Sequence, residues 1–121
     1  MIVLAVLLAI APSTSLSIGP WTGSDFQTTT DGAAKFRLEV SGKPNATLRL
    51  RATGVAQGWL AAFCTPHLCS PQQVGVQLSS SGNAVLQFEL IRESSAAPTA
   101  SGATITDGAG ASVSVPSAHR Q

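Results

Sequence analysis

Apolar and polar residues alternate in several short segments of the chain. In residues 36–40, for example, Phe, Leu and Val alternate with Arg and Glu. Successive side chains of a β-strand point to opposite faces of a sheet, so this period of two predicts a strand with one buried and one solvated face. The same alternation recurs along the chain at residues 48–51, 74–78, 86–90, 103–105 and 113–115.

Residues that favour turns separate these segments. Gly, Asn, Asp, Ser and Pro are concentrated at residues 30–32, 41–45, 79–83 and 107–110, and glycine or asparagine supplies the positive φ that many turns need. No window shows the 3.6-residue period of an amphipathic helix. Residues 93–101, which lack any period, are expected to form a long loop.

With two further strands at residues 16–19 and 59–63, seven or eight short strands follow one another at a regular spacing. Such regularity is typical of a β-sandwich or a small barrel. Antiparallel pairing is favoured, because the strands have solvated faces and no crossover helices lie between them. We therefore predict an all-β protein: one antiparallel β-sandwich domain of seven to eight strands at residues 18–116, followed by a frayed tail at residues 117–121.

The first eleven residues are all apolar, and Pro12 ends the run. An apolar segment of this length is too short to span a membrane as a helix, which requires about 20 residues. It fits the apolar part of a secretory signal peptide, although no Lys or Arg follows Met1. We predict a signal peptide at residues 1–17, with Ala11 and Ser17 as candidate cleavage positions, and a secreted or periplasmic mature protein without a stable membrane span.

The chain has 121 residues, a formal net charge of +1 and only 11% charged residues. Soluble domains usually contain about 25% charged residues, and proteins that bind nucleic acid or anionic membranes concentrate Lys and Arg in runs or patches. No run of charges occurs in this sequence. Its charge balance therefore predicts no nucleic-acid partner and gives no sign of binding to an anionic membrane.

Residues 58–71 contain both cysteines, Cys64 and Cys69, and one of the two histidines, His67. A turn through Pro66 can bring the Cα atoms of the cysteines within the range of about 4.4–6.8 Å that disulfides use. An exported protein lies in an oxidising compartment, which favours a disulfide between them. A redox dithiol is the second possibility, although such sites usually have a C-x-x-C spacing at the start of a helix.

A third possibility follows from the segment Cys64-Thr65-Pro66-His67, which resembles the ligand loop of blue-copper proteins such as plastocyanin and amicyanin. The resemblance implies a Cys64 thiolate and a His67 imidazole as copper ligands in a β-sandwich. Blue-copper sites use a second histidine and a weak axial methionine, and here the second imidazole would be that of His119. A copper or redox site formed by Cys64, His67 and Cys69 is thus the alternative to a protein with no metal and no cofactor.

The wider pattern of residues 34–115 resembles small exported bacterial domains of the immunoglobulin-like type. The resemblance is carried by Trp59, Phe63, the two cysteines and Pro71, followed by an alternating strand, a Ser-Gly turn and the segment 86–90. It implies a secreted sandwich in which the paired cysteines close a loop at one end. It implies no catalytic residues.

The cysteine loop is the candidate contact surface, with Trp59, His67 and Leu68 as its candidate binding residues. Trp59 has two interpretations, a core residue that packs on the disulfide or an exposed ring that stacks on a sugar or peptide. Hydrolase, metalloprotease and phosphate-loop motifs are absent, and Glu39 and Glu89 occupy polar strand positions where we expect solvent. We predict a non-catalytic module with a structural or adhesive role at the cell envelope, where it binds a protein or glycan.

Overall fold

The computed structural model of the chain describes residues 14–26, 33–93 and 95–119. These residues form eleven β-strands, and no helix among them is long and apolar enough to cross a membrane. In chain order the strands are β1 (Ser15–Pro20), β2 (Ala34–Ser41), β3 (Thr47–Thr53), β4 (Trp59–Cys64), β5 (Cys69–Pro71), β6 (Gln73–Gln77), β7 (Asn83–Arg92), β8 (Thr99–Ala100), β9 (Thr104–Thr106), β10 (Ser112–Ser114) and β11 (Ala118–His119).

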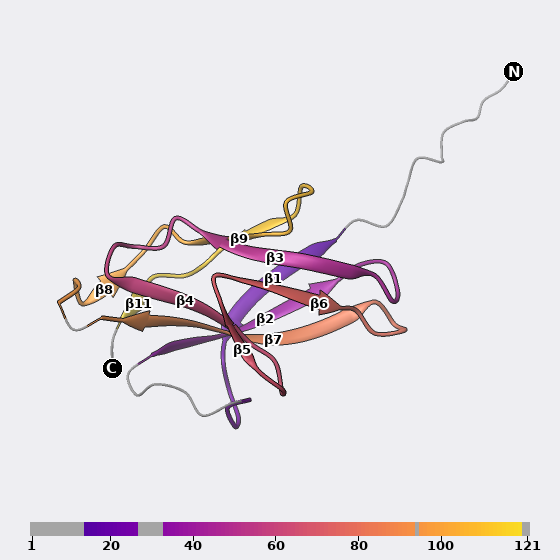
Figure 1. Cartoon of the computed structure of the whole chain (residues 1–121), viewed down its shortest axis with the longest axis horizontal. Helices are drawn as coiled ribbons and strands as arrows, with labels where there is room; N and C mark the ends of the chain where they lie inside the picture. Colours follow the sequence, from indigo (N-terminus) through magenta and orange to yellow (C-terminus); the bar gives the residue numbers. More distant parts are fainter. Residues whose placement is uncertain (1–13, 27–32, 94, 120–121) are drawn as a thin grey trace, which may run out of the picture.

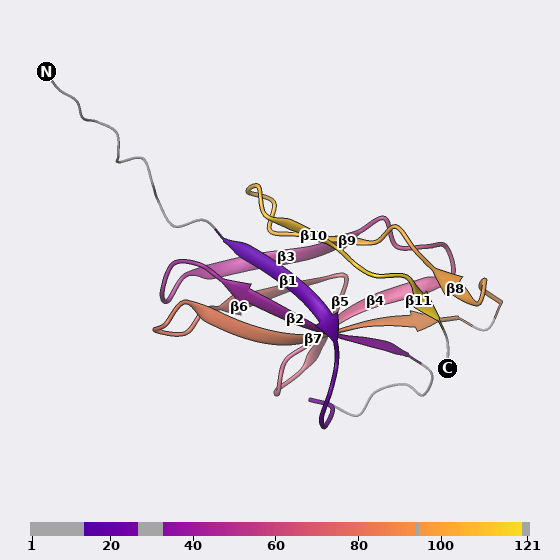
Figure 2. The ribbon, with the colours of Figure 1, turned by 180° about the vertical axis from the view of Figure 1, so that it is seen from behind.

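Two antiparallel sheets form the body of the protein (Figure 1). The larger sheet has the strand order β1-β2-β7-β4-β5, and the smaller sheet has the order β10-β9-β3-β6. β8 and β11 pair in a separate two-stranded ribbon. Figure 2 shows the arrangement from behind, with β1 and β2 of the larger sheet toward the viewer. The prediction of an all-β antiparallel sandwich is confirmed.

The core lies between the two sheets and follows the alternation of the sequence. Leu38, Leu86 and Phe88 of the larger sheet are completely buried, as are Leu50 and Ile105 of the smaller sheet. Each buried Leu, Ile or Phe contributes about 1.5–3 kcal/mol to stability, so these side chains hold the sheets together. The opposite face of the larger sheet points away from the smaller sheet, and we call it the outer face.

More strands are present than the seven to eight predicted. β5, β8 and β11 contain only two or three residues each, too few to show an alternating pattern. β8 lies inside the predicted loop at residues 93–101, and β11 lies inside the predicted frayed tail at residues 117–121. Ala118 of β11 pairs with Ala100 of β8 and is buried in the hydrophobic core. The folded domain therefore includes the first part of this tail.

The sandwich also begins earlier than residue 18. Residues 1–13 of the predicted signal peptide lie outside the described residues, but its last three residues, 15–17, belong to β1. There they pair with the end of β2, and the side chain of Leu16 packs against the hydrophobic core. The domain boundary is therefore corrected to the start of β1, at Ser15.

A chain that begins at Ile18 should be less stable than a chain that begins at Ser15. The shorter chain lacks half of β1 and the partly buried Leu16, which should lower the free energy of unfolding by about 1–3 kcal/mol through lost apolar burial and backbone pairing. Urea unfolding of the two chains, followed by tryptophan fluorescence, measures the difference. Equal free energies of unfolding would show that the first half of β1 is not part of the folded unit.

Candidate functional site

The two cysteines lie at the end of the β4–β5 hairpin, at one edge of the larger sheet. Cys64 and Cys69 are partners in register, and a disulfide joins them. Their Cα atoms are 3.9 Å apart, closer than the range expected from the sequence. The predicted disulfide is confirmed, and neither cysteine is free. A dithiol would exist only after reduction of this bond.

Residues 65–68 connect the two cysteines, and we call them the hairpin tip. The backbone N–H of Thr65 donates to the carbonyl oxygen of Leu68 at 2.8 Å. Oγ1 of Thr65 accepts hydrogen bonds from the backbone N–H groups of His67 and Leu68, both at 3.2 Å. Hydroxyl groups that bind backbone groups shortly ahead in the chain fix turns in this way. Together with the disulfide, these bonds give the hairpin tip one defined shape.

His67 and Leu68 are exposed at the hairpin tip, and Leu68 is 52% exposed. Trp59, the third predicted contact residue, is only 4% exposed and belongs to the core cluster between the sheets. Its indole Nε1 donates to the carbonyl oxygen of Ala97 at 3.0 Å. The contact surface is therefore corrected to exclude Trp59. Its ring does not lie beside the disulfide either, because Trp59 and Cys64 occupy opposite faces of β4.

Two polar side chains, Gln87 and Glu89, are buried on the outer face of the larger sheet. They lie on β7, the middle strand of the sheet, and are 0% and 2% exposed. The expectation that Glu89 faces solvent is therefore wrong. The same expectation is confirmed for Glu39 of β2, whose side chain is 54% exposed and forms an ion pair with Arg37 at 2.7 Å.

Two parts of the chain cover these polar side chains. One is the β4–β5 hairpin, because Sγ of Cys64 lies 3.4 Å from Oε2 of Glu89. The other is the segment 21–26, which follows β1. Its two rings, Trp21 and Phe26, pack edge to face with centroids 4.8 Å apart, and the backbone N–H of Phe26 donates to Oε1 of Gln87 at 2.8 Å. Both parts project from the same side of the larger sheet (Figure 1 and Figure 2).

The hydrogen bond from Phe26 fixes the orientation of the Gln87 amide. Since Oε1 faces a donor, the two hydrogens of Nε2 point to acceptors. Nε2 lies 3.0 Å from Oδ1 of Asp25 and 3.4 Å from Oε2 of Glu89. Nζ of Lys35 binds Oδ2 of Asp25 at 2.9 Å. The lysine ammonium is thus paired with Asp25, although Lys35 and Glu89 are partners in register.

Burial raises the pKa of Glu89 above its ordinary value of 4.5, because loss of water penalises the charged form of the carboxyl group. The positive charge of Lys35 lowers this pKa and the negative charge of Asp25 raises it, and both effects are smaller than that of burial. Glu89 therefore keeps its proton to a higher pH than an exposed glutamate does.

The carboxyl group of Glu89 also contacts the disulfide. Its Oε2 lies 3.4 Å from Sγ of Cys64. A sulfur atom in a disulfide carries no hydrogen, so a proton shared between these two atoms must belong to Glu89. After reduction, the S–H group of Cys64 could instead donate to the Glu89 carboxylate. A buried titratable group therefore lies directly beside a reducible bond.

The potential ligand atoms of Cys64, Cys69 and Glu89 lie within 4.8 Å of one another. Metal ions bind deprotonated thiolates, whereas these two sulfur atoms are bonded to each other. His67 does not belong to this group, and His119 lies on β11 in the separate ribbon. The described residues do not assemble the copper site of Cys64, His67 and Cys69, which stays a prediction for the reduced protein.

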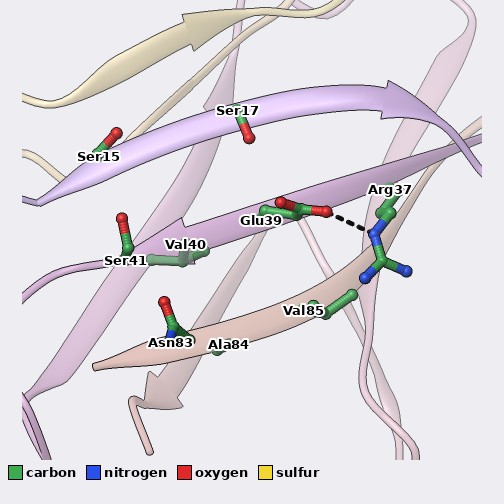
Figure 3. Close-up of a pocket in the computed structure, with 9 residues that line it drawn as sticks. All are labelled: Ser15, Ser17, Arg37, Glu39, Val40, Ser41, Asn83, Ala84 and Val85. Carbon is green, nitrogen blue, oxygen red and sulfur yellow. Dashed lines mark hydrogen bonds and ion pairs between the residues drawn. The ribbon is translucent and has the colours of Figure 1, made fainter. Parts of the chain in front are cut away.

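A shallow hollow of about 260 Å³ lies over β1, β2 and β7 (Figure 3). Ser15, Ser17 and Asn83 contribute hydroxyl and amide groups to it. Figure 3 also shows Arg37 and Glu39 in the hollow, joined to each other by their ion pair. Its two charged side chains are therefore already paired, and polar and apolar atoms line it about equally, whereas small-molecule sites are lined mostly by apolar residues.

No family model matches the chain, and no curated protein or solved structure matches it at a significant level. The function therefore has to be argued from the residues themselves. Two features stand out in the described structure: the exposed hairpin tip, and the buried carboxyl group of Glu89 on the other side of the same disulfide.

Sequence reasoning did not identify Asp25, Gln87 and Glu89 as neighbours. One signal was present, because the outer row of β7 also contains Val85 and Ile91, which are untypical of a fully solvated face. When a middle strand has both apolar and polar residues on one face, another part of the chain is expected to cover some of that face. No local pattern places Asp25 there, since 62 positions separate it from Gln87.

Glu89→Gln should stabilise the protein relative to wild type increasingly as the pH rises. A glutamate whose pKa is raised by folding stabilises the fold below its unfolded pKa, and this contribution is lost as the pH rises through the folded pKa. The difference in unfolding free energy should grow by about 1.4 kcal/mol for each unit by which the pKa is raised. Urea unfolding at a series of pH values measures it.

Glu39→Gln is the matched control on the same face, because Glu39 is exposed. The difference in unfolding free energy between Glu39→Gln and wild type should change little over the same pH series. A Glu89→Gln difference that stays constant or shrinks with rising pH would contradict a raised pKa at Glu89.

Replacing both Cys64 and Cys69 by alanine should lower the free energy of unfolding by about 2 kcal/mol, the value expected for a closed loop of this length. Urea unfolding at neutral pH measures the loss. Wild type in excess reductant should approach the stability of the double variant. If the double variant is as stable as oxidised wild type, the disulfide does not contribute to the fold.

Proposed function

We propose that the chain is an exported, non-catalytic binding module of the cell envelope, in which the hairpin tip contacts a protein or glycan partner. The observation that carries this proposal is the shape and exposure of the tip. Residues 65–68 are closed by the disulfide, fixed internally by Thr65, and present His67 and Leu68 to solvent.

A preformed loop loses less conformational entropy on binding than a flexible one does. Immobilising a mobile side chain at an interface costs about 0.5–1.5 kcal/mol, and the fixed backbone of the hairpin tip avoids a comparable cost for the loop itself. Leu68 offers apolar area that can fill a pocket on a partner, and the imidazole of His67 offers hydrogen bonds beside it. The tip thus combines rigidity with two complementary contacts.

Export is supported by the disulfide and by the apolar run at the N-terminus. Disulfides persist in oxidising compartments and are rare in the cytosol, and the run fits the apolar part of a signal peptide. Because β1 begins at Ser15, cleavage must occur before that residue to keep the strand complete. Of the two candidate positions, Ala11 meets this condition and Ser17 does not.

The strand order supports an immunoglobulin-like fold. In constant-type immunoglobulin domains, the first, second, fifth and fourth strands form one sheet, and the third, sixth and seventh form the other. The orders β1-β2-β7-β4 and β10-β9-β3 correspond to these two sheets when β5, β6 and the short strands β8 and β11 are taken as additions. On this interpretation, β5 is an added edge strand, and it carries the Cys69 end of the hairpin tip.

The positions of three carboxyl groups support a non-catalytic role. Asp25 and Glu39 are paired with basic side chains, and Glu89 is buried. A general acid or base must come within hydrogen-bond reach of its substrate. The carboxyl group with the clearest raised pKa is therefore the one that an external substrate does not reach.

Binding of the purified domain to cell envelopes isolated from the source organism tests the proposal. We expect saturable binding by the wild type and at least about tenfold weaker binding by Leu68→Ser, because a Leu side chain lost from a pocket costs about 1.5–3 kcal/mol. Leu60→Ser is the matched control, since Leu60 lies on β4 and is 50% exposed, close to the 52% of Leu68.

Equal binding of Leu68→Ser and wild type, or an equal loss for both serine variants, would contradict a role of the hairpin tip. Absence of saturable binding by the wild type would contradict the envelope role itself. Protease treatment of the envelopes should abolish binding if the partner is a protein, and it should leave binding intact if the partner is a glycan.

A further inference from the structure

We propose that Glu89 is the internal proton donor when an external thiol opens the Cys64–Cys69 disulfide. The proposal rests on the 3.4 Å contact between Oε2 of Glu89 and Sγ of Cys64, and on the unequal exposure of the two cysteines. It does not depend on which partner the hairpin tip binds.

The exposure of the cysteines decides which sulfur atom is attacked. A thiolate forms a bond with one sulfur of a disulfide and expels the other. Cys64 is 1% exposed, whereas Cys69 is exposed on the edge strand β5. An external thiolate therefore reaches Cys69, and Cys64 becomes the leaving group. The leaving sulfur is the one that contacts Glu89.

The electrons and protons of this step balance. The external sulfur bonds to Sγ of Cys69 while the S–S bond breaks, and the electron pair of that bond moves to Sγ of Cys64. The proton of Glu89 then passes to this sulfur, which leaves a Cys64 thiol and a Glu89 carboxylate. A second thiolate attacks the external sulfur of this mixed disulfide and expels Sγ of Cys69, which takes a proton from water. Two molecules of thiol are thereby oxidised to one disulfide while the cystine is reduced to two thiols.

The proton of Glu89 assists the opening of the disulfide because a buried thiolate on Cys64 is unfavourable. Burial in apolar surroundings raises the pKa of a cysteine, and the leaving sulfur of Cys64 has little contact with water. Protonated Glu89 neutralises it across a single contact. The carboxylate that forms keeps Nε2 of Gln87 at 3.4 Å and gains the new S–H group as a second donor. Ionised Glu89, in contrast, repels the thiolate that develops on Cys64.

Two charged groups face Glu89 within the described structure. Lys35 is its partner in register on β2, and Asp25 of the segment 21–26 binds both that lysine and Gln87. Their charges act on Glu89 in opposite directions. The effect of burial therefore remains the dominant one on its proton.

Groups farther along the outer face are not among the causes of the raised pKa of Glu89. Arg37 and Glu39 form their own ion pair one row away on β2. On the other side of Glu89, its partner in register on β4 is Ala62, which carries no charge. Asp31 lies outside the described residues. Glu89 is therefore the titratable group that contacts the leaving sulfur.

The kinetics of reduction by 2-mercaptoethanol test this proposal. The rate of opening, divided by the thiolate concentration, is measured over a pH series that begins below the ordinary glutamate pKa of 4.5 and rises until Glu89 is ionised. For wild type this normalised rate should fall at least about tenfold as Glu89 loses its proton, a modest value for loss of general acid assistance. For Glu89→Gln it should stay constant, because the amide does not titrate.

Two further variants keep the test decisive. Glu39→Gln, an exposed glutamate on the same face, should show the wild-type fall. Glu89→Asp withdraws the carboxyl group from Sγ of Cys64, so its normalised rate should fall less than that of wild type. A pH-independent wild-type rate, or the same fall in Glu89→Gln, would overturn the proposal.

The position of the first adduct gives an independent test. Opening is stopped with acid after a short reaction, and peptide mass analysis locates the 2-mercaptoethanol group. We expect the group on Cys69, with the free thiol on Cys64. An adduct mainly on Cys64 would overturn the assigned leaving group, and with it the role of Glu89, whatever the pH profile shows.

Discussion

The burial of β7 on both faces is the constraint on which the rest of the structure depends. Its inner row, with Leu86 and Phe88, packs between the sheets, and its outer row carries Gln87 and Glu89. Buried polar groups need partners inside the protein. The segment 21–26 and the β4–β5 hairpin supply them, so the segment after β1 and the disulfide are both held against the same strand.

The disulfide connects this buried cluster with the exposed surface. On one side it closes the hairpin tip, where His67 and Leu68 face solvent, and on the other side Cys64 contacts Glu89. A buried carboxyl group is an unfavourable component of a fold at neutral pH, since an amide or apolar side chain avoids the loss of hydration. Titratable groups whose pKa is perturbed by burial are concentrated at functional sites, and the proposed donation of a proton to Cys64 would give Glu89 such a role.

Features of the fold that depend on residues close together in the sequence could be predicted. Features that depend on contacts between distant segments could not. Alternation predicts β2, β3, β6 and β7, and spacing predicts the disulfide. The same alternation places Glu89 in solvent, because it ignores the segment that folds back over the sheet. The alternation does not decide whether Trp59 is buried or exposed. It also does not predict β8 and β11, which contain two residues each. The pairing of Asp25 with Lys35 needs the three-dimensional path of the chain.

The fold places the Glu89 carboxyl group against the Cys64 sulfur and raises the pKa of that carboxyl group. Carbon-13 NMR of the Glu89 carboxyl group in the oxidised protein, recorded through a pH titration, measures this most directly. We expect a midpoint above the ordinary pKa of 4.5 and a parallel shift of the Cys64 β-carbon, because the two groups are in contact. A midpoint at or below 4.5, or a Cys64 β-carbon shift that does not change during the titration, would show that the contact or the raised pKa is absent.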